Sequence, residues 1–531
     1  MFKKIFSDQS TIKRATALLI ITLIVSNVLG MLRDHFLASR VSTYSLDVYY
    51  AAFKIPDLIF NVLVLGAISS VFIPIFTEKV AHQKEGRARE ITNRLMTASL
   101  VFTGLFAVIL YFTLPWLIPL LVPRFSADRL AQTVKIARII SLTPILFSLS
   151  YITSGVLNSY RRFLAYSMAP LVYNLAIIFG TLLLVNRFDI VGVAWAVVAG
   201  AFLHFLVQIP SILQTGFKYR LEKFWHDKDL FRIVRLMIPR SIGLGTSQIT
   251  TLAFTAIASA LAAGSIAVFT FADNIQTMPV VVFGTSLATV LFPTLSAEIA
   301  ENNKENFAGY FTRALKAIIY IMLPTSVVFY LLSNQIVRLI LGSGKFSLFD
   351  TSRAGQTLAA FCFGLVFEAV LALIVKAFFA QKNTRLPMYA GLLAMFSAIA
   401  FGYLLSRFFG VPGLALGLAA GNLISVVYLM YYLNKRFVKV DFGDLSKFVA
   451  KSLVSAAATG LITFLLIKIT FYFVDLRHYF GILTQTLVSA LGGIIGFCIV
   501  SKWLGVEEYD SIVKNIFVRF KPPQEAPFEE K

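Results

Sequence analysis

Five charged residues lie close together in an otherwise apolar stretch near the start of the chain: Arg33, Asp34, Asp47, Lys54 and Asp57. An ionised side chain at membrane depth is costly, and it is retained mainly where it faces water, a partner or a substrate. An arginine guanidinium can bind phosphate oxygens through two parallel N–H donors, whereas a lysine ammonium acts as a compact positive charge. These residue types therefore predict a polar cavity that binds an anionic group.

Two apolar runs, residues 15–39 and 48–78, must position these charges. Pro56, Gly66 and Pro74 interrupt the second run. Broken helices are tolerated in membranes when the freed backbone groups are satisfied by neighbours or line a cavity. We expect this stretch to form one wall of a polar cavity inside a helical membrane protein.

The composition of the whole chain agrees with this class. Its 531 residues are 58% hydrophobic and 14% charged, with a mean hydropathy of +0.78, whereas a soluble domain has about 25% charged residues. Because a membrane-spanning helix needs about 20 mainly apolar residues, the sequence predicts an all-α polytopic protein. About 14 spans are expected, at residues 15–39, 48–78, 95–121, 137–158, 164–186, 190–214, 233–262, 266–297, 311–333, 355–380, 387–408, 412–434, 447–474 and 479–504.

The net charge of +21 is explained by short basic loops. Five of them alternate onto one side of the predicted topology, at residues 79–94, 161–162, 218–240, 376–385 and 435–451. Cytoplasmic loops of membrane proteins carry such an excess of Lys and Arg. We therefore expect both termini in the cytoplasm and no nucleic-acid partner.

An internal repeat divides the chain. Residues 66–81 resemble residues 284–300, and residues 154–170 resemble residues 374–387. The aligned prolines, Pro74 with Pro293 and Pro170 with Pro387, are separated by about 219 and about 217 residues. This predicts two parallel six-helix lobes, residues 1–214 and 215–440, then two added helices within 441–504 and a cytoplasmic tail, 505–531.

No enzymatic chemistry is evident in the sequence. Cys362 and Cys498 lie in apolar runs without metal-ligand spacing and are expected to pack as small apolar residues. Hydrolase, metalloprotease and nucleotide-binding motifs do not occur in a plausible context. We expect a transporter without cofactor or metal rather than an enzyme.

Several motifs carry a family resemblance: GMLRDHFLA, DVYYAAFKIPDLI, GAISSVFIPIFTE, PRSIGLGTSQI, FADNIQTMP, LFPTLS and KAFFAQKNTRLP. In this order and at these spacings they resemble the MurJ (MviN) lipid II flippases of the multidrug/oligosaccharidyl-lipid/polysaccharide exporter superfamily. The resemblance covers residues 15–500. It implies a protein of the bacterial inner membrane that moves a polyprenyl-pyrophosphate-linked peptidoglycan precursor by alternating access through a cationic cavity.

The resemblance also implies site residues. Arg33, Asp34, Asp47 and Lys54 match family positions, while three positions where the family often has arginine carry Asn27, Phe60 and Asn274. We therefore include Asn61, which lies beside Phe60, and Asn274 among the candidates, together with Asp273, Gln248 and Arg240. Lys54 and Arg240 are expected to supply part of the missing charge.

Each candidate also has a plainer interpretation. For Arg33 and Asp34 it is a mutually neutralising pair. Because adjacent residues on a helix point about 100° apart, we expect poor mutual pairing and favour a substrate or gating role. Asp47 either caps its own helix, binds Lys54 or contacts the substrate. Glu368 is a candidate for ion or proton coupling, since it is a carboxylate at membrane depth.

The sequence leaves one alternative function open. Because arginines of the family's cationic set are replaced, the chain also fits an exporter of another polyprenyl-linked saccharide or of drugs. Lipid II, membrane lipids and cell-wall synthesis proteins are the expected partners of a flippase.

Overall fold

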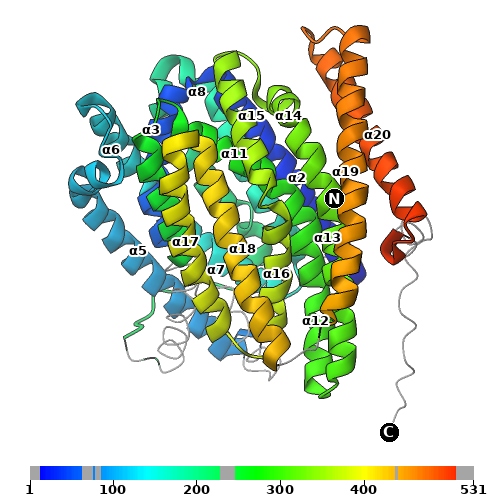
Figure 1. Ribbon diagram of the computed structural model, residues 1–531. Coiled ribbons are helices and arrows are strands. Elements are labelled where there is room, and N and C mark those ends of the chain that lie inside the picture. Colours follow the sequence, from blue (N-terminus) through cyan, green and yellow to red (C-terminus); the bar gives the residue numbers. More distant parts are fainter. Residues whose placement is uncertain are drawn as a thin grey trace. The chain divides into compact units, whose positions relative to one another are not determined.

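The computed structural model describes residues 12–61, 76–77, 85–225, 227, 245–436 and 440–509. In these ranges the regular elements are helices, so the predicted all-α class is confirmed (Figure 1). The first helices are α2 (Ile12–Arg40), α3 (Thr43–Ile59), α5 (Glu85–Leu121), α6 (Ala127–Ile140), α7 (Thr143–Ser159), α8 (Phe163–Leu206) and α9 (Ile209–Leu213). A helix over residues 245–259 follows.

The remaining helices complete the described chain. They are α11 (Ser265–Pro279), the π-helical segment η3 (Val280–Thr285), α12 (Ser286–Ala300), α13 (Lys304–Leu331), α14 (Ser333–Leu341), α15 (Leu348–Cys362), α16 (Leu365–Ala380), α17 (Arg385–Phe409), α18 (Val411–Arg436), α19 (Phe442–Phe473) and α20 (Tyr479–Trp503).

Many of these helices are suited to a membrane. Ten in the described part are long and apolar enough to span it, or 11 if α15 and α16 count together as one broken span. The predicted second and seventh spans extend into residues 62–75 and 228–244, which lie outside the described residues. The expected number of about 14 spans therefore stays a prediction, while the polytopic class is confirmed.

The backbone repeats where the sequence repeats. Arg161 and Lys382 both have a positive φ, 55° and 57°, at the end of a helix. In each case the next N–H closes the same turn, from Arg162 to the Leu157 carbonyl (2.8 Å) and from Asn383 to the Phe378 carbonyl (3.0 Å). The first motif of the repeat, with Pro74, lies mostly outside the described residues.

A second backbone pair has the same spacing along the chain. Asp189 (φ 48°, ψ −143°) interrupts α8, and Gly410 (φ 64°, ψ −135°) separates α17 from α18. Two predicted spans, 164–186 and 190–214, are thus joined through one kinked element, whereas their counterparts form two helices. Local geometry therefore supports the internal repeat independently of the sequence.

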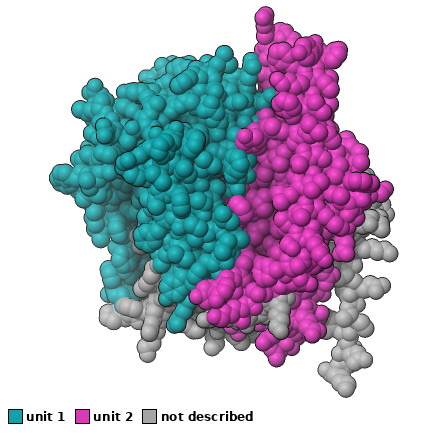
Figure 2. Space-filling model, in the orientation of Figure 1, with its two compact units in different colours: residues 1–278, 333–364, 384–428 teal, residues 279–332, 365–383, 429–531 magenta. Residues whose placement is uncertain are grey.

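The chain forms two compact units (Figure 2). Unit 1 comprises residues 1–278, 333–364 and 384–428, and unit 2 comprises residues 279–332, 365–383 and 429–531. In unit 1, α2 packs on α8, α7 on α8, and α3 on α6; in unit 2, α13 packs on α19 and α19 on α20. The lobes predicted from the repeat, with boundaries at residues 214 and 440, stay a prediction.

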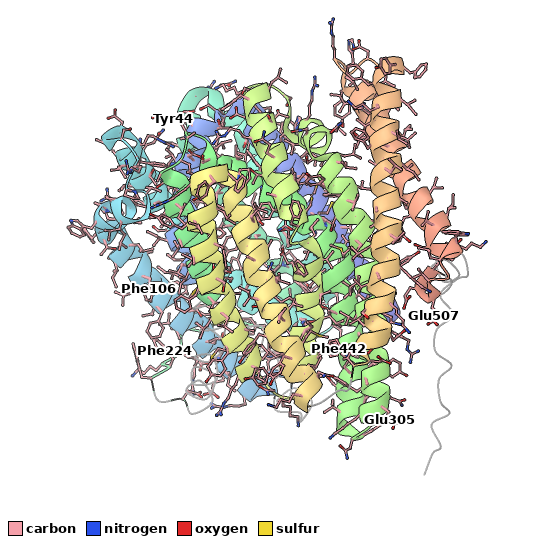
Figure 3. The ribbon with its side chains drawn as sticks, viewed as in Figure 1. Tyr44, Phe106, Phe224, Glu305, Phe442 and Glu507 are labelled. Atoms are coloured by element: carbon pink, nitrogen blue, oxygen red, sulfur yellow. The ribbon has the colours of Figure 1, made fainter. Side chains whose placement is uncertain are left out.

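The outer faces of several helices are apolar. On α5 the side chains of Phe102, Leu105, Phe112 and Trp116 are exposed, and Figure 3 shows side chains projecting along this helix, where Phe106 is labelled. Contiguous exposed apolar surface of this kind is expected of a face that contacts lipid. Most of the polar residues described next lie in unit 1.

Candidate functional site

Arg33 and Asp34 of α2 form the centre of the site. The Nε and Nη2 atoms of Arg33 both donate to Oδ1 of Asp34, at 3.0 and 2.9 Å. The expectation of poor mutual pairing is therefore wrong, because the long arginine side chain bends back and brings two nitrogens to one oxygen. The Arg33 side chain nevertheless stays 24% exposed, whereas that of Asp34 is buried.

Two asparagines from distant helices complete this pair. Asn174 of α8 accepts from Nη1 of Arg33 through Oδ1 (3.1 Å) and donates to the carbonyl of Ser26 (3.4 Å). Asn274 of α11 donates to Oδ2 of Asp34 (2.8 Å). Sequence reasoning identified Asn274 but missed Asn174, for which the only signal is a lone amide within an apolar run.

The guanidinium of Arg33 keeps two unused donors. A guanidinium has five N–H groups, and three of those of Arg33 have partners in the described residues. One N–H on each terminal nitrogen has none there. Two free donors on one rigid planar group suit a phosphate oxygen pair.

A second polar group contains Lys54 and two carboxylates. Lys54 of α3 interacts electrostatically with Asp57, three residues further on, and with Asp273 of α11. Asp273 also accepts from Nε2 of Gln276 (3.0 Å). Within the described residues no ion pair within 4 Å is formed by Lys54, so its ammonium is not tied to one carboxylate.

Asp47 has partners other than those expected. Its carboxylate accepts from Nη2 of Arg129 on α6 (3.0 Å) and from the backbone N–H groups of Gly264 (2.7 Å) and Ala267 (2.9 Å). The N-cap of its own helix α3 is Ser42. The alternatives of capping that helix or binding Lys54 are therefore wrong, since Asp47 instead caps the beginning of α11.

The other candidates are more scattered. Nδ2 of Asn61 donates to the carbonyl of Asp57 on its own helix (2.9 Å). Gln248 is half-buried in the helix over residues 245–259. Glu368 lies in the first turn of α16, in unit 2, and Arg240 lies outside the described residues. Among the described residues, no group of three His, Cys, Asp or Glu side chains is arranged to hold a metal ion.

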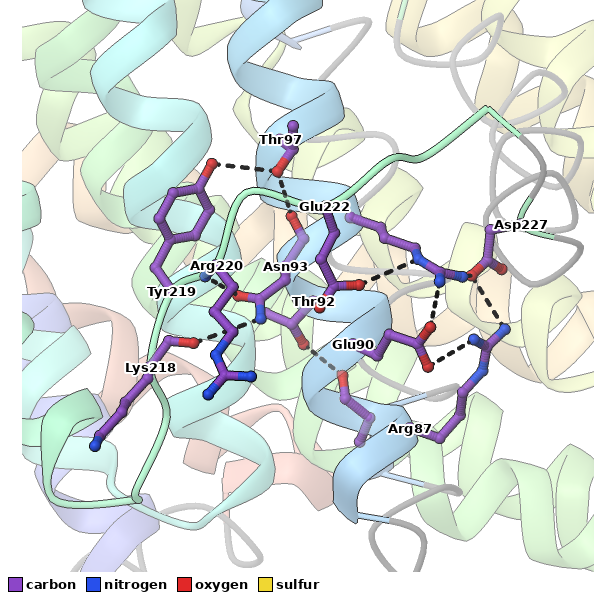
Figure 4. Close-up of polar contacts among 12 residues, drawn as sticks. Arg87, Glu90, Thr92, Asn93, Thr97, Lys218, Tyr219, Arg220, Glu222 and Asp227 are labelled. Atoms are coloured by element: carbon purple, nitrogen blue, oxygen red, sulfur yellow. Dashed lines mark hydrogen bonds and ion pairs between the residues drawn. The ribbon is translucent and has the colours of Figure 1, made fainter.

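Sequence reasoning also missed an ionic network at the predicted cytoplasmic end of α5 (Figure 4). Arg87 pairs with Glu90 (2.8 Å) and with Asp227 (3.0 Å), and Arg94 pairs with the same two carboxylates. The Oδ1 atom of Asn93 accepts a hydrogen bond from the backbone N–H of Arg220 (3.2 Å). The network fastens the segment after α9 to the start of α5, and it was missed because its members are about 130 residues apart.

The fold and this interior polar site define a class, the polytopic helical membrane proteins with charged residues in their interior. One solved structure with this fold is an inward-facing multidrug resistance MATE family transporter of the MOP superfamily, with a TM-score of 0.66 and 16% identity, covering 79% of this chain and 98% of that chain. At this identity the likeness shows the fold alone.

The particular family is given by the sequence. The family model for the lipid II flippase MurJ matches residues 41–483, and the chain belongs to this family. A solved structure of "Lipid II flippase MurJ, inward closed conformation" has a TM-score of 0.76 and 25% identity, and covers 95% of this chain and all of that chain.

Curated relatives agree. A probable lipid II flippase MurJ of Vibrio cholerae is 26% identical over 513 residues, 94% of this chain and 95% of the relative. Another, of Rhizobium tropici, is 29% identical over 453 residues, 82% of this chain and 83% of the relative. The family expected from the sequence motifs is confirmed, and the alternative of a different saccharide or drug exporter is not favoured.

Proposed function

We propose that this chain moves lipid II from the cytoplasmic to the outer leaflet of the bacterial inner membrane by alternating access. The pyrophosphate of the head group binds in the polar interior of unit 1, while the polyprenyl tail stays in lipid. The single observation that supports this most directly is Arg33, which is held at one edge by Asp34 and Asn174 and has two N–H donors without a partner among the described residues.

Net charge alone does not account for anion binding here. The described charged groups of the site are two cations, Arg33 and Lys54, and three carboxylates, Asp34, Asp57 and Asp273. Recognition therefore depends on directed donors. They are a fixed guanidinium, whose hydrogen bonds to phosphate are charge-assisted, and the Lys54 ammonium, which forms no ion pair within 4 Å in the described part of the chain. Any further positive charge would come from residues outside the described ranges, with Arg240 as the sequence candidate.

The remaining site residues have different proposed roles. Asn274 and Asp273 border the same space as Arg33 and Lys54, whereas Asp47 supports α11 through its backbone. Asn61 and Gln248 are proposed to lie beside the bound head group. Glu368 is proposed for ion or proton coupling.

The membrane potential is one proposed energy source for the transport. With both termini in the cytoplasm, moving negative charge outward is favoured by an inside-negative potential, by about 2.3 kcal/mol per charge per 100 mV. The protein needs no catalytic step or cofactor for this transport. Cell-wall synthesis enzymes are its proposed protein partners because they consume the flipped precursor.

Replacing Arg33 tests the assignment. We expect Arg33→Ala to weaken lipid II binding by the purified full chain about 30- to 100-fold, because charge-assisted hydrogen bonds contribute most of the directed recognition. The matched control is Arg407→Ala, since Arg407 is exposed on α17 and contacts Tyr403 of the same helix. Equal affinities of Arg33→Ala and the unchanged chain would contradict the role of Arg33.

A further inference from the structure

Tyr50 of α3 is a buried residue whose hydroxyl group lacks a hydrogen-bond partner in the described part of the chain. Tyr50 is only 8% exposed. Its hydroxyl is buried and has no hydrogen-bond partner among the described residues. Buried hydroxyl groups in native proteins nearly always have a partner, and each exception requires an explanation. One explanation is a hydrogen-bond partner that is present only when substrate is bound.

The position of Tyr50 indicates which partner that is. Tyr50 lies within the range at which the charges of Arg33 and Asp34 would act on its hydroxyl if that group ionised. Its ring packs edge-on against Phe271 of α11, at 5.6 Å between centroids, and against Tyr49, at 5.2 Å. The ring is therefore held by aromatic packing between α3 and α11, within electrostatic range of the arginine assigned to the pyrophosphate.

We propose that the Tyr50 hydroxyl is an additional head-group donor, which hydrogen-bonds a pyrophosphate oxygen of the lipid-linked substrate when Arg33 binds it. This inference rests on the proposed function. A phenol is a neutral donor, so it adds recognition without adding charge to a site that already contains three carboxylates. It would offset part of what is lost where Asn27, Phe60 and Asn274 replace family arginines.

The competing interpretation is a tyrosine retained only for packing. In that case the Tyr50 hydroxyl makes no contribution to substrate binding, and phenylalanine at this position would bind substrate equally well. The two interpretations predict different results for Tyr50→Phe, which removes the hydroxyl and leaves the ring contacts with Phe271 and Tyr49 in place.

The experiment measures lipid II affinity, competition by inorganic pyrophosphate, and thermal unfolding of the purified full chain in detergent. For Tyr50→Phe we expect lipid II and pyrophosphate to bind about five- to tenfold more weakly. The unfolding temperature should be unchanged or higher, because a buried hydroxyl without a partner has been removed.

The matched control is Tyr320→Phe. The Tyr320 hydroxyl is also buried without a hydrogen bond of good geometry in the described part, but its ring packs on Phe497 (4.8 Å) in unit 2. It lies on α13 and has no described contact with Arg33. We expect this variant to bind lipid II as the unchanged chain does.

Three results would overturn the inference. Unchanged binding by Tyr50→Phe, with or without a lower unfolding temperature, would leave Tyr50 a packing residue. Weaker binding of lipid II with unaltered competition by pyrophosphate would refute the contact with the pyrophosphate. Failure of the unchanged chain to bind lipid II would overturn the proposed function itself, and the Tyr50 inference with it.

Discussion

At the scale of single residues, the site depends on how one arginine is oriented. Charged residues within an apolar run identified Arg33, Asp34 and Lys54 from the sequence, because their cost in a membrane is a local signal. Asn174 gave only the weak signal of one amide in an apolar run and Tyr50 gave none, because an uncharged polar side chain costs less at membrane depth than an ionised one. Asn174 is 141 residues from Arg33, so only the fold could reveal that they meet.

Asn174 accepts a hydrogen bond from Arg33 and should therefore lie beside the bound anion. An aspartate there could still accept from the guanidinium, but it would add a negative charge beside the site. We expect Asn174→Asp to weaken lipid II binding about tenfold or more while the unfolding temperature stays unchanged or rises. Lipid II titration and thermal unfolding of the same preparation measure both.

Asn303→Asp provides the matched control for that substitution. The side chain of Asn303 is the N-cap of α13, a position that aspartate also fills well. Binding by this variant should equal that of the unchanged chain. If Asn174→Asp lowered stability and binding together, or changed neither, the placement of Asn174 beside the bound anion would be untenable.

At the scale of helices, the site is positioned by the contacts that hold the N-terminus of α11. Asp47 of α3 accepts hydrogen bonds from two backbone N–H groups at that end. Arg129 of α6 neutralises the carboxylate. The Cζ atom of Arg129 lies 3.6 Å from the ring centroid of Phe125 and 4.2 Å from that of Tyr44. Residues further along α11 include Asp273 and Asn274. The contact of Asp47 with α11 therefore fixes the register in which Asn274 reaches Asp34.

Asp47→Asn should destabilise this junction. The substitution removes the charge that compensates buried Arg129, and breaking such a pair from one side costs about 3–5 kcal/mol in the free energy of unfolding. The measurement is unfolding of the full chain in detergent. Asp128→Asn is the control: Asp128 is exposed in the first turn of α6, so its loss should cost less than about 1 kcal/mol. Equal effects of both variants would rule out a special role for Asp47.

At the scale of the whole molecule, the sequence predicted the class of fold well and its interruptions poorly. Hydropathy located the apolar runs because burial in lipid is a property of every residue in a span. It did not predict that the span expected at residues 355–380 is divided between α15 and α16 by a break at Phe363 and Gly364. An added Cβ on Gly364 would lie 2.9 Å from the Cβ of Ala419. Such breaks depend on close packing with distant helices, and no local pattern records them.

The internal repeat could be predicted because both of its halves retain proline positions, and the matching backbone turns at Arg161 and Lys382 support it. What the repeat could not indicate is that most described site residues would lie in unit 1, on α2, α3, α8 and α11. The paired charges on α2 have no equivalent among the described candidates of unit 2, where Glu368 is the only candidate.

The measurement that tests the central claim most directly is rescue of a bacterium whose own lipid II flippase is switched off. Expression of the full chain should restore growth, and the Arg33→Ala variant, present in the membrane at the same level, should not. Rescue by the unchanged chain alone would establish that its reduced arginine set, centred on Arg33, suffices for lipid II transport. Equal rescue by both chains, or no rescue by a well-inserted unchanged chain, would contradict the account.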